Sequence, residues 1–365
     1  MRVLIDISHA SRGPTGSGVY VRELVAALRE REGVELIEAS QRVRLRSGRA
    51  GGALSPLRTV ANLVLDALWL HGGLPRAAAA ARADVVHHPL PAYSSRIAAP
   101  QVATVHDVAF LALPGRYGRA WRVYARRTYR RAVRRCAAVV CPSQATAIEV
   151  MGLLRGHPAK LVVARHGPGQ SSPTGPGRAE PEDGPLLFVG DSEPRKNLNG
   201  LLAAYAAYRA GVDGEEGTGD PVPLVLAGAG AAAATGHPGV QARPVLSVAG
   251  LEQLYSVARA LVHPSLHEGF GLTPLEAMAR GVPVLAVRNA GTQEVCGDAA
   301  LLVEPAELAT GLQRIATDDR LRANLGRQGR ERVRAFSWSK SARDHESAYT
   351  LARRRASSEP GAGTP

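Results

Sequence analysis

The sequence predicts an α/β fold of two domains, each a parallel sheet covered by helices. Short runs rich in β-branched residues alternate with longer Ala-, Leu- and Arg-rich segments of helical period, and this pattern is typical of strand–helix–strand units. A stretch dense in Gly, Pro and Ser interrupts the alternation at 167–185, where neither period persists. Because the alternation then restarts, we expect two domains in tandem joined by a linker.

The first domain is predicted over residues 1–168, and its strands and helices alternate from the first residues onward. The expected strands are Arg2–Ile7, Val85–His88, Val102–His106, Ala138–Cys141 and Lys160–Ala164. The expected helices are 18–31, 58–70, 116–135 and 143–153.

After a linker at 169–184, the second domain is predicted over 185–337 and repeats the pattern. Its expected strands are Leu186–Val189, Val222–Leu226, Ala260–Val262 and Val282–Val287. Its expected helices are 197–209, 251–259 and 274–280, followed by Arg-rich helices within 306–335, a last helix at 338–354 and a disordered tail at 355–365.

The composition is that of a globular protein: 45% of the 365 residues are hydrophobic and 21% are charged, which leaves room for roughly two domains of 100–200 residues. Three cysteines without a C-x-x-C pair indicate neither a disulfide framework nor a zinc site. The apolar run at the N-terminus is too short for a signal peptide, and the stretch 59–70 is too short for a membrane span. We therefore expect a cytoplasmic protein.

The basic charge belongs to one half of the chain. Residues 1–168 carry 25 Lys and Arg against 10 Asp and Glu, whereas 169–365 carry 20 against 22. This asymmetry suggests a polyanionic partner such as a membrane surface, phosphorylated lipid or nucleic acid. The alternative is a general overuse of arginine, which supplies 42 of the 45 basic residues.

The segment 115–136 concentrates this charge, with nine arginines and an apolar stripe at helical spacing that includes Trp121 and Tyr124. A basic amphipathic helix of this kind suits the headgroup region of an anionic membrane, and we expect peripheral association with the inner face of the cell membrane. The alternative is that the stripe packs on the sheet of the first domain while the arginines face water.

The densest chemical signal lies at 267–283. Thr273 suits a helix N-cap, and Glu276 three residues later completes a capping box. Ahead of the helix, Gly269 and Gly271 let the backbone approach a ligand closely, and the N–H groups at the helix start favour a phosphate.

A pair of adjacent cations, Arg195 and Lys196, follows the strand 186–189. Open α/β sheets bind ligands beyond the carboxyl ends of their strands, so these cations are placed to hold a diphosphate. The alternative interpretation is structural: Glu276 only caps its helix, and Glu268 is a solvated loop residue.

Four motifs in order along the chain resemble those of the family-4 glycosyltransferases. They are T-V-H-D-V-A-F at 104–110, C-P-S-Q-A-T at 141–146, E-P-R-K-N at 193–197, and Glu268 with Glu276 in E-x7-E spacing. The resemblance covers nearly the whole chain. It implies a GT-B architecture, in which two Rossmann-like domains face a cleft and the C-terminal helix crosses back to the N-terminal domain.

The resemblance implies roles for residues of the second domain. Arg195 and Lys196 would hold the donor diphosphate, Glu276 would accept hydrogen bonds from the nucleotide ribose, and Glu268 would contact the donor sugar. The backbone that contacts sugar and phosphate would be that of Gly269, Phe270, Gly271, Leu272 and Thr273.

In the first domain, the resemblance implies that His106 approaches the transferred sugar and that Gly16 and Gly18 line the cleft near the phosphates. A hydrogen-bonded structural pair of His106 with Asp107 and a tight turn at the two glycines are the alternatives. His87, His88 and His263 match no motif and are interpreted as structural.

The implied reaction is transfer of a hexose from a nucleoside-diphosphate sugar to a saccharide or lipid-linked acceptor, with retention at the anomeric carbon. GDP-mannose is the expected donor, with UDP-glucose and UDP-N-acetylglucosamine as alternatives. No carboxylate is clearly placed as a nucleophile, which favours front-face substitution over a nucleophilic Glu268. No D-x-D pair occurs in the chain, so we expect no metal and no cofactor.

Two other classes of protein share single features with this sequence. The segment 228–233 fits the G-x-G-x-x-A pattern of NAD(P)-dependent oxidoreductases, but no acidic residue follows between 231 and 251 to take the ribose. The basic first half could suit a nucleic-acid-binding protein, but no zinc-finger or RNA-recognition signature supports it.

Overall fold

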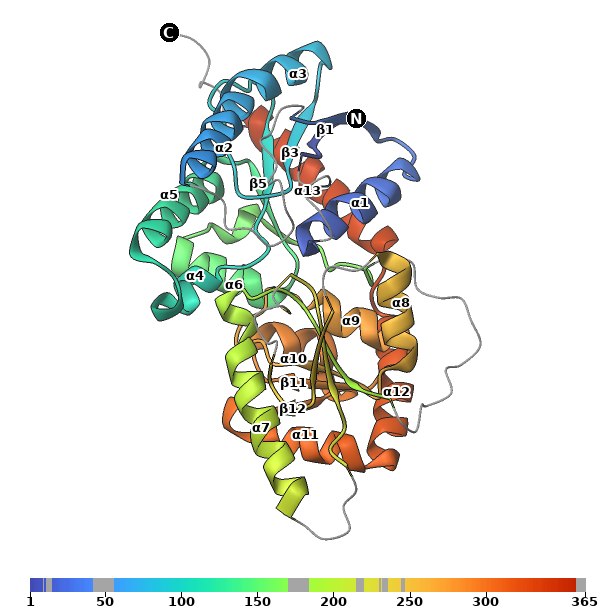
Figure 1. The fold of residues 1–365 in the computed structure, drawn as a ribbon. Helices are drawn as coiled ribbons and strands as arrows, with labels where there is room; N and C mark the ends of the chain where they lie inside the picture. The colour runs from blue at the N-terminus through green and yellow to red at the C-terminus, as the bar shows by residue number, and fades with distance from the viewer. Residues whose placement is uncertain are drawn as a thin grey trace. The chain divides into compact units, whose positions relative to one another are not determined.

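The chain forms two compact units, and the last helix returns to the first of them after the second is complete (Figure 1). Unit 1 comprises Met1–Leu111, Gly118–Arg165 and Trp338–Pro365, and unit 2 comprises Ala112–Tyr117 and His166–Ser337. The computed structural model describes residues 1–8, 10, 15–41, 56–169, 184–214, 220–229, 231, 236–243 and 247–358. Of the expected linker, 170–183 lie outside the described residues.

Unit 1 is built on a six-stranded sheet in the order β2-β1-β3-β4-β5-β6. Every neighbouring pair of strands is parallel, and the central strands are buried along their whole length, as expected when helices cover both faces. The strands are β1 (Arg2–Asp6), β2 (Glu35–Ala39), β3 (Val85–His88), β4 (Gln101–Thr104), β5 (Ala138–Cys141) and β6 (Leu161–Val163).

Helices connect these strands, and the π-helical turn η1 (Trp69–Gly73) joins the helices α2 and α3. The helices are α1 (Gly16–Arg29), α2 (Pro56–Leu68), α3 (Leu74–Ala80), α4 (Ala109–Ala112), α5 (Arg119–Arg135) and α6 (Gln144–Leu154).

The last helix, α13 (Trp338–Ser358), packs in the core of unit 1 although it follows unit 2 in the sequence. Its buried Ala348 and Tyr349 join the cluster that contains Val85 of β3. This confirms the predicted return of the last helix. The helix continues past residue 355, where the disordered tail was expected, and residues 359–365 lie outside the described part.

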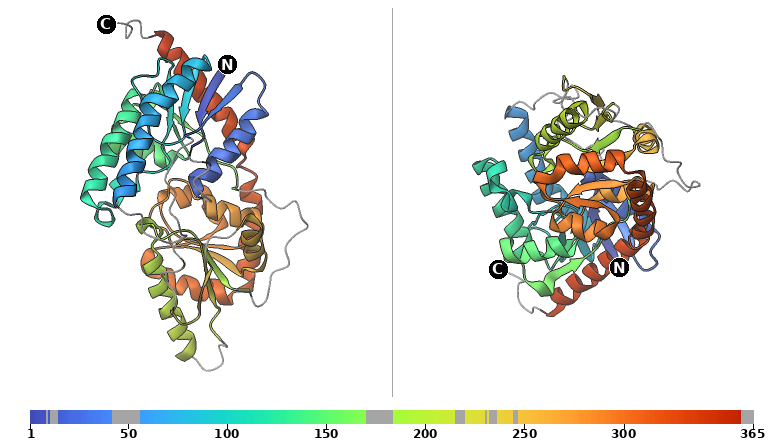
Figure 2. Two further views of the ribbon diagram at one scale, coloured as in Figure 1. Left: turned by 45° about the horizontal axis from the view of Figure 1, so that its top comes forward. Right: turned by 90° about the horizontal axis from the view of Figure 1, so that it is seen from below.

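Unit 2 repeats the plan with a parallel sheet in the order β12-β11-β10-β7-β8-β9, and helices lie on both sides of it (Figure 2). The strands are β7 (Leu186–Val189), β8 (Leu224–Ala227), β9 (Val240–Arg243), β10 (Ala260–His263), β11 (Val284–Val287) and β12 (Leu301–Val303). The helices are α7 (Leu198–Gly214), α8 (Val248–Val257), α9 (Leu272–Ala279), α10 (Ala290–Cys296), α11 (Leu308–Thr317) and α12 (Asp319–Val333). The two-domain α/β fold predicted from the sequence is confirmed.

Three of the four edge strands of the two sheets, β2, β9 and β12, were not expected from the sequence, whereas the edge strand β6 was. β12 has only three residues, and in β2 and β9 Glu, Gln or Arg side chains interrupt the apolar ones. A half-exposed strand gives no continuous apolar run of the kind that marks a buried parallel strand. In the described parts of the chain, no helix combines the length and the apolarity that crossing a membrane requires.

Candidate active site

Two neighbouring strands of unit 2 deliver the charged residues that the sequence singled out. β7 continues through Gly190 to the short 3-10 helix η4 (Pro194–Lys196), and β10 continues into the loop that carries Glu268. Because β7 and β10 pair in parallel, both loops leave the carboxyl edge of the sheet. The N–H of Leu266 donates to the carbonyl of Arg195 at 2.9 Å, which ties the two loops together.

Glu268 is the centre of a buried ion cluster. Arg195 Nη1 lies 2.6 Å from its Oε2, and Lys196 Nζ lies 2.7 Å from its Oε1. His263 Nε2 is 3.1 Å from the same Oε1. On its other side, Arg195 Nε donates to Glu193 at 3.0 Å. Arg195 therefore bridges two carboxylates, and Lys196 pairs with one of them.

The charge state of this cluster follows from burial and proximity. Burial alone would raise the pKa of the Glu268 carboxyl, but the charges of Arg195 and Lys196 outweigh it and hold that pKa well below its usual range. Burial lowers the pKa of His263 despite its proximity to Glu268. At neutral pH, Glu268 is a carboxylate and His263 is a neutral imidazole.

The structure corrects the predicted start of the helix in the 267–283 motif. α9 begins at Leu272, after Gly271 with φ of +108°, and no side chain caps it. Glycine adopts this left-handed conformation without strain, so the chain turns into the helix before Thr273 can cap it. Glu276 closes no capping box, and its Oε2 instead accepts a hydrogen bond from the Tyr255 hydroxyl at 3.2 Å.

The start of α9 is suited to hold an anion. It lacks a side-chain cap, so its N–H groups and its dipole are available to a phosphate. The preceding Phe270 is buried, and its ring lies 5.0 Å from that of His166 and 5.7 Å from that of Phe336. This packing fixes the loop between Glu268 and the helix.

Glu276 belongs to a second buried group. Burial raises its pKa to about 7, against the opposing charge of Arg280. The guanidinium of Arg280 donates to the Glu276 carbonyl at 2.8 Å, pairs with Glu252, and lies 4.9 Å from the centre of the Tyr255 ring. These partners come from α8 and from the end of α9, and no sequence pattern predicted that Tyr255 reaches the site.

α10 supports the backbone of the cluster, another feature that the sequence did not reveal. The side-chain amide of Asn289 donates to the Ser265 carbonyl at 2.9 Å. A Cβ on Gly291 would lie 2.1 Å from the Glu268 carbonyl oxygen, so only glycine permits this approach. α10 itself begins with a capping box, formed between Asn289 and Thr292.

The site residues expected in the N-terminal half lie in unit 1. His106 follows β4, its Nε2 is 2.9 Å from the Pro89 carbonyl oxygen, and its ring meets that of Tyr20 edge-on at 4.6 Å. Gly16 and Gly18 form the first turn of α1, where Gly18 N–H donates to the Thr15 cap. His106 and Gly18 therefore have structural contacts, and a role of the three residues toward substrate is a proposal.

The expected residues of unit 2 lie on η4, on the loop that precedes α9 and on α9 itself. They are Arg195, Lys196, Glu268, Gly269, Phe270, Gly271, Leu272, Thr273 and Glu276. His263, Tyr255 and Gly291 are the additions made by the structure.

Two family descriptions match the chain in order. Glycosyltransferase Family 4 matches residues 14–167, and Glycosyl transferases group 1 matches residues 177–332. Together they cover most of the chain.

Curated relatives match over shorter stretches. The O-antigen chain mannosyltransferase B of Escherichia coli is 33% identical over 179 residues, which is 46% of this chain and 46% of that protein. The D-inositol 3-phosphate glycosyltransferase of Actinosynnema mirum is 30% identical over 240 residues, or 59% of this chain and 57% of that protein. The chain thus spans about half the length of these relatives.

Among solved structures, the sucrose-phosphate synthase of Thermosynechococcus elongatus superimposes with a TM-score of 0.75 at 19% identity, covering 96% of this chain and 98% of that one. At this identity the likeness speaks for the fold. With the two family matches and the ion cluster placed at the carboxyl edge of a Rossmann-like sheet, the chain belongs to the group 1 glycosyltransferases, and its fold is GT-B.

Proposed function

We propose that the chain transfers a hexose from a nucleoside-diphosphate sugar to an acceptor hydroxyl, with retention of the anomeric configuration. The observation that carries this proposal is the convergence of Arg195 and Lys196 on Glu268 beside the uncapped start of α9. Two mostly buried cations and a helix N-terminus are suited to a diphosphate that gains charge as it departs. Membership of the family supports a nucleotide sugar as its source.

Donor binding exchanges the partners of the two cations. In the structure, the carboxylate of Glu268 accepts the hydrogen bonds of Arg195 and Lys196 that phosphate oxygens would accept. In the proposed complex with the nucleotide sugar, the diphosphate accepts these hydrogen bonds, and the carboxylate of Glu268 turns to the sugar hydroxyls. The cations then keep an anionic partner in both states, and Glu268 exchanges its two ion pairs for hydrogen bonds from the sugar hydroxyls.

The proposed reaction is a front-face substitution. The bond between the anomeric carbon and the diphosphate oxygen breaks while the acceptor oxygen bonds to the same face of that carbon. The acceptor proton passes to the departing diphosphate, so no protein base is needed. In this account the carboxylate of Glu268 contacts the sugar hydroxyls and does not attack the anomeric carbon.

Two further residues are proposed to position the donor. Glu276 would accept hydrogen bonds from the ribose hydroxyls in its carboxylate form, and its pKa of about 7 makes that form sensitive to pH near neutrality. His106, at the carboxyl end of β4, would approach the transferred sugar. Gly16 and Gly18 would line the donor site from the start of α1.

GDP-mannose is the proposed donor, supported by a relative named as a mannosyltransferase. UDP-glucose and UDP-N-acetylglucosamine are the alternatives. The side-chain cations take the place of a metal ion in this proposal, and the nucleotide sugar is a substrate, so neither metal nor cofactor is invoked.

The proposed acceptor is a saccharide or a lipid-linked saccharide. An anionic membrane surface is proposed as a partner of unit 1, since α5 carries exposed arginines such as Arg126, Arg127 and Arg134 and no acidic residue. This corresponds to a cytoplasmic protein that associates with the inner face of the membrane.

The deciding experiment is nucleotide release by the purified protein across a panel of GDP- and UDP-sugars, followed by acceptor screening with the active donor. NMR of the product then gives its anomeric configuration. Release from one donor, with retention in the product, is the expected result. Absence of release from every donor and acceptor, in protein that binds GDP or UDP normally, would contradict the proposed activity.

A further inference from the structure

The outward face of α2 is apolar. Val60, Leu63, Val64 and Leu68 recur at helical spacing and are 59%, 46%, 53% and 64% exposed. On the opposite side of the same helix, Asn62 is only 4% exposed. A surface helix ordinarily turns its apolar stripe to the core and its polar side chains to water. α2 does the reverse, which is typical of a helix whose outer face meets a nonaqueous partner.

α5 exposes aromatic and basic side chains together. Of the expected apolar stripe, Ala125, Ala132 and Val133 are buried, whereas Trp121 and Tyr124 are 53% and 50% exposed. Part of the stripe therefore packs within unit 1, as the alternative expectation had it, and Trp121 and Tyr124 lie at the surface. Exposed Trp and Tyr beside arginines are the composition found at the level of lipid headgroups.

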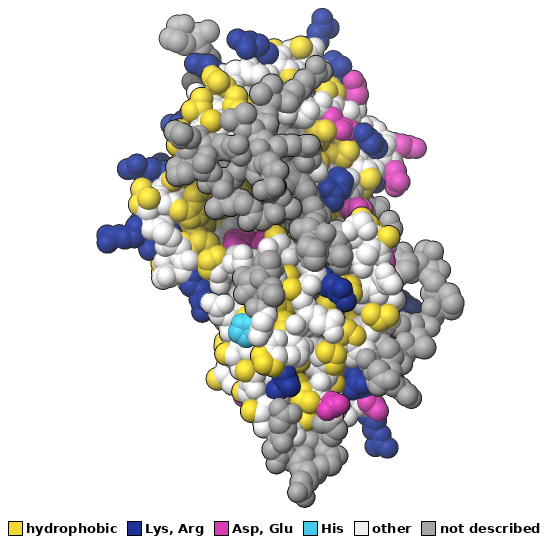
Figure 3. Space-filling model, viewed as in Figure 1, with side chains coloured by type: hydrophobic (Ala, Val, Ile, Leu, Met, Phe, Trp, Pro, Cys, Tyr) yellow, Lys and Arg dark blue, Asp and Glu magenta, His cyan; other side chains and the backbone are white. Residues whose placement is uncertain are grey.

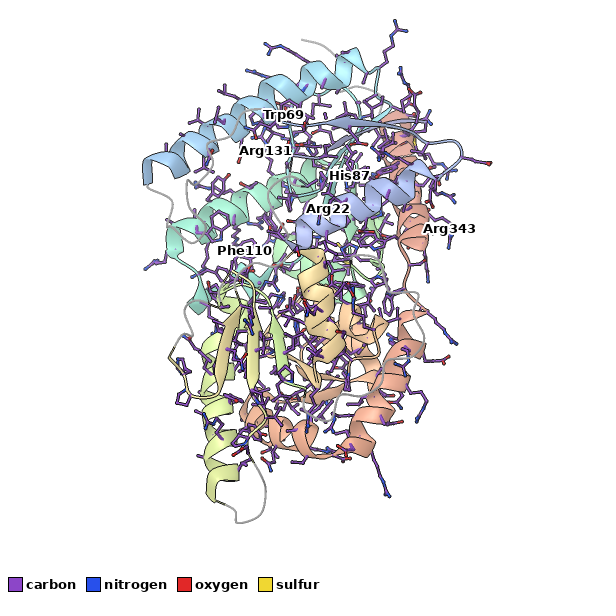
Figure 4. The ribbon with its side chains drawn as sticks, turned by 45° about the vertical axis from the view of Figure 1, so that its right-hand side comes forward. Arg22, Trp69, His87, Phe110, Arg131 and Arg343 are labelled. Carbon is purple, nitrogen blue, oxygen red and sulfur yellow. The ribbon has the colours of Figure 1, made fainter. Side chains whose placement is uncertain are left out.

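The two helices lie side by side along one edge of unit 1 in both Figure 1 and Figure 2. Figure 4 places Arg131 of α5 close to Trp69, in the turn that continues α2. Burial and then the charges of Arg131 and Arg96 lower the pKa of His71 in that turn. Figure 3 shows hydrophobic side chains along this edge, with Lys and Arg side chains around them.

The positive charge of α5 favours one class of partner for the surface formed by α2 and α5. A second copy of the chain docked face to face would bring the arginines of two α5 helices together, and like charges across an interface are unfavourable. An anionic lipid surface instead offers phosphates to the arginines and an acyl boundary to the aliphatic face. A membrane therefore satisfies both features at once.

We propose that α2 and α5 form one membrane-docking surface, in which the aliphatic face of α2 inserts at the acyl boundary of an anionic bilayer while the arginines of α5 bind lipid phosphates. This inference deepens the proposed association with anionic lipid by adding an element that inserts. It predicts binding with two components, one weakened by salt and one that resists it.

The test is sedimentation with vesicles of phosphatidylglycerol and phosphatidylcholine, compared with phosphatidylcholine alone, at low salt and at high salt. Val64→Ser with Leu68→Ser removes exposed aliphatic groups from α2. Val248→Ser with Val257→Ser is the matched control, because these side chains are similarly exposed on α8 of unit 2. A third variant changes Arg126, Arg127 and Arg134 to Gln.

The wild type and the α8 control are expected to sediment with anionic vesicles and to keep a bound fraction at high salt. The α2 variant should bind about tenfold more weakly and lose the fraction that resists salt, whereas the arginine variant should lose binding mainly at low salt. Binding of the α2 variant equal to wild type at both salt concentrations overturns the insertion of α2 and leaves the electrostatic association standing.

Absence of sedimentation for all four proteins overturns both membrane proposals. A wild-type dimer in analytical ultracentrifugation that the α2 variant breaks would assign the face to a second copy instead. Nucleotide release with a water-soluble acceptor, measured without vesicles, should be equal in all four proteins. It tests the proposed transfer reaction separately from the docking surface.

Discussion

Unit 1 and unit 2 both bury polar side chains, but those of unit 1 form a neutral network and those of unit 2 form a charged cluster. In unit 1, Thr104 Oγ1 lies 2.9 Å from both the Tyr20 hydroxyl and His87 Nε2. The Tyr20 hydroxyl also lies 2.8 Å from His345 Nε2, and the Tyr349 hydroxyl lies 2.9 Å from His87 Nδ1. Burial lowers the pKa of His345 to about 4 and that of His87 well below its usual value. The network is therefore neutral.

With neutral histidines, the hydrogen bonds of this network can run in only one direction. His345 Nδ1 must donate to the Ser341 carbonyl 2.7 Å away, so its Nε2 accepts from Tyr20. The Tyr20 hydroxyl then accepts from Thr104, and Thr104 accepts from His87. Every member is satisfied without a charge, and α13 is tied to α1, β3 and β4.

In unit 2, by contrast, the cluster around Glu268 retains full charges. A buried ion cluster adds little net stability, because desolvation of its members opposes their attraction. Its advantage is that a charged ligand can replace one of its members. The comparison teaches that the neutral network serves to hold the fold, whereas the charged cluster is suited to exchange with a ligand.

The largest expected effect is on turnover. Arg195→Ala and Lys196→Ala should each lower kcat by about 100-fold, because a departing diphosphate then lacks one of its two cations. Each variant should also melt at a lower temperature than wild type, since Glu268 is left buried with less compensation. The measurements are nucleotide release and thermal unfolding.

A matched variant separates the two effects of losing a cation. Adding Glu268→Gln to Lys196→Ala removes the buried carboxylate and should restore the melting temperature without restoring turnover. Full activity in either single variant, in protein that folds normally, would return Arg195 and Lys196 to a purely structural role.

The next effect is on the stability of unit 1. Tyr349→Phe removes the hydroxyl that donates to His87 and leaves a buried acceptor unsatisfied, at a cost of about 1–3 kcal/mol. Urea unfolding measures this loss. Tyr124→Phe is a control on α5, where the side chain is 50% exposed. Equal loss in the two variants would contradict the special role of the network.

The same network makes a prediction for pH. The pKa of His345 is about 4 in the folded state against 6.5 in the unfolded state, so the unfolded chain binds more protons between these values. Stability should therefore fall as the pH is lowered from about 6.5 to about 4. The drop should be smaller in His345→Gln, which has no imidazole to titrate.

A smaller effect is expected at Glu276. Glu276→Gln keeps the size of the side chain but is a poorer acceptor for ribose hydroxyls, so affinity for GDP or UDP should fall about tenfold in calorimetry at pH 8. At pH 6, below the folded pKa of about 7, the wild-type carboxyl is mostly protonated and the difference should shrink. Equal affinities at both pH values would assign Glu276 to its contact with Tyr255 alone.

Stability should change in the opposite sense to binding. The pKa of Glu276 is raised from 4.5 to about 7, so the folded state holds the proton more tightly than the unfolded state. Its contribution to stability is present below about pH 4.5 and is lost as the pH rises to about 7. Glu276→Gln should therefore gain stability relative to wild type between these values.

The features that could be predicted from the sequence are those that depend on local patterns of residues. Buried parallel strands such as 138–141 are continuous apolar runs, and the cations at 195–196 stand directly after a strand. The position of a helix start depends on backbone conformation, and Gly271 in a left-handed turn moved α9 ahead of the expected cap at Thr273. No pattern in the sequence predicts that Gly271 adopts this conformation.

Contacts between distant segments were beyond the sequence. His263 was interpreted as structural, and the register of β10 places it 3.1 Å from Glu268. Tyr255 reaches Glu276 from another helix. The network of unit 1 joins Tyr20 to His345 across 325 positions. Such contacts depend on tertiary packing, which the local patterns of a single sequence do not reveal.

The smallest expected effect is that of chelation, and it tests whether the cations of unit 2 act alone. Arg195 and Lys196 supply two positive charges at the proposed diphosphate site, and the described residues include no group of three His, Cys, Asp or Glu side chains suited to a metal. Turnover in EDTA should match turnover in buffer alone. Loss of turnover that Mg²⁺ or Mn²⁺ specifically restores would show that a metal shares the diphosphate with these cations. The charged cluster would then be only part of the site, and its contrast with the neutral network of unit 1 would need a third charge to explain it.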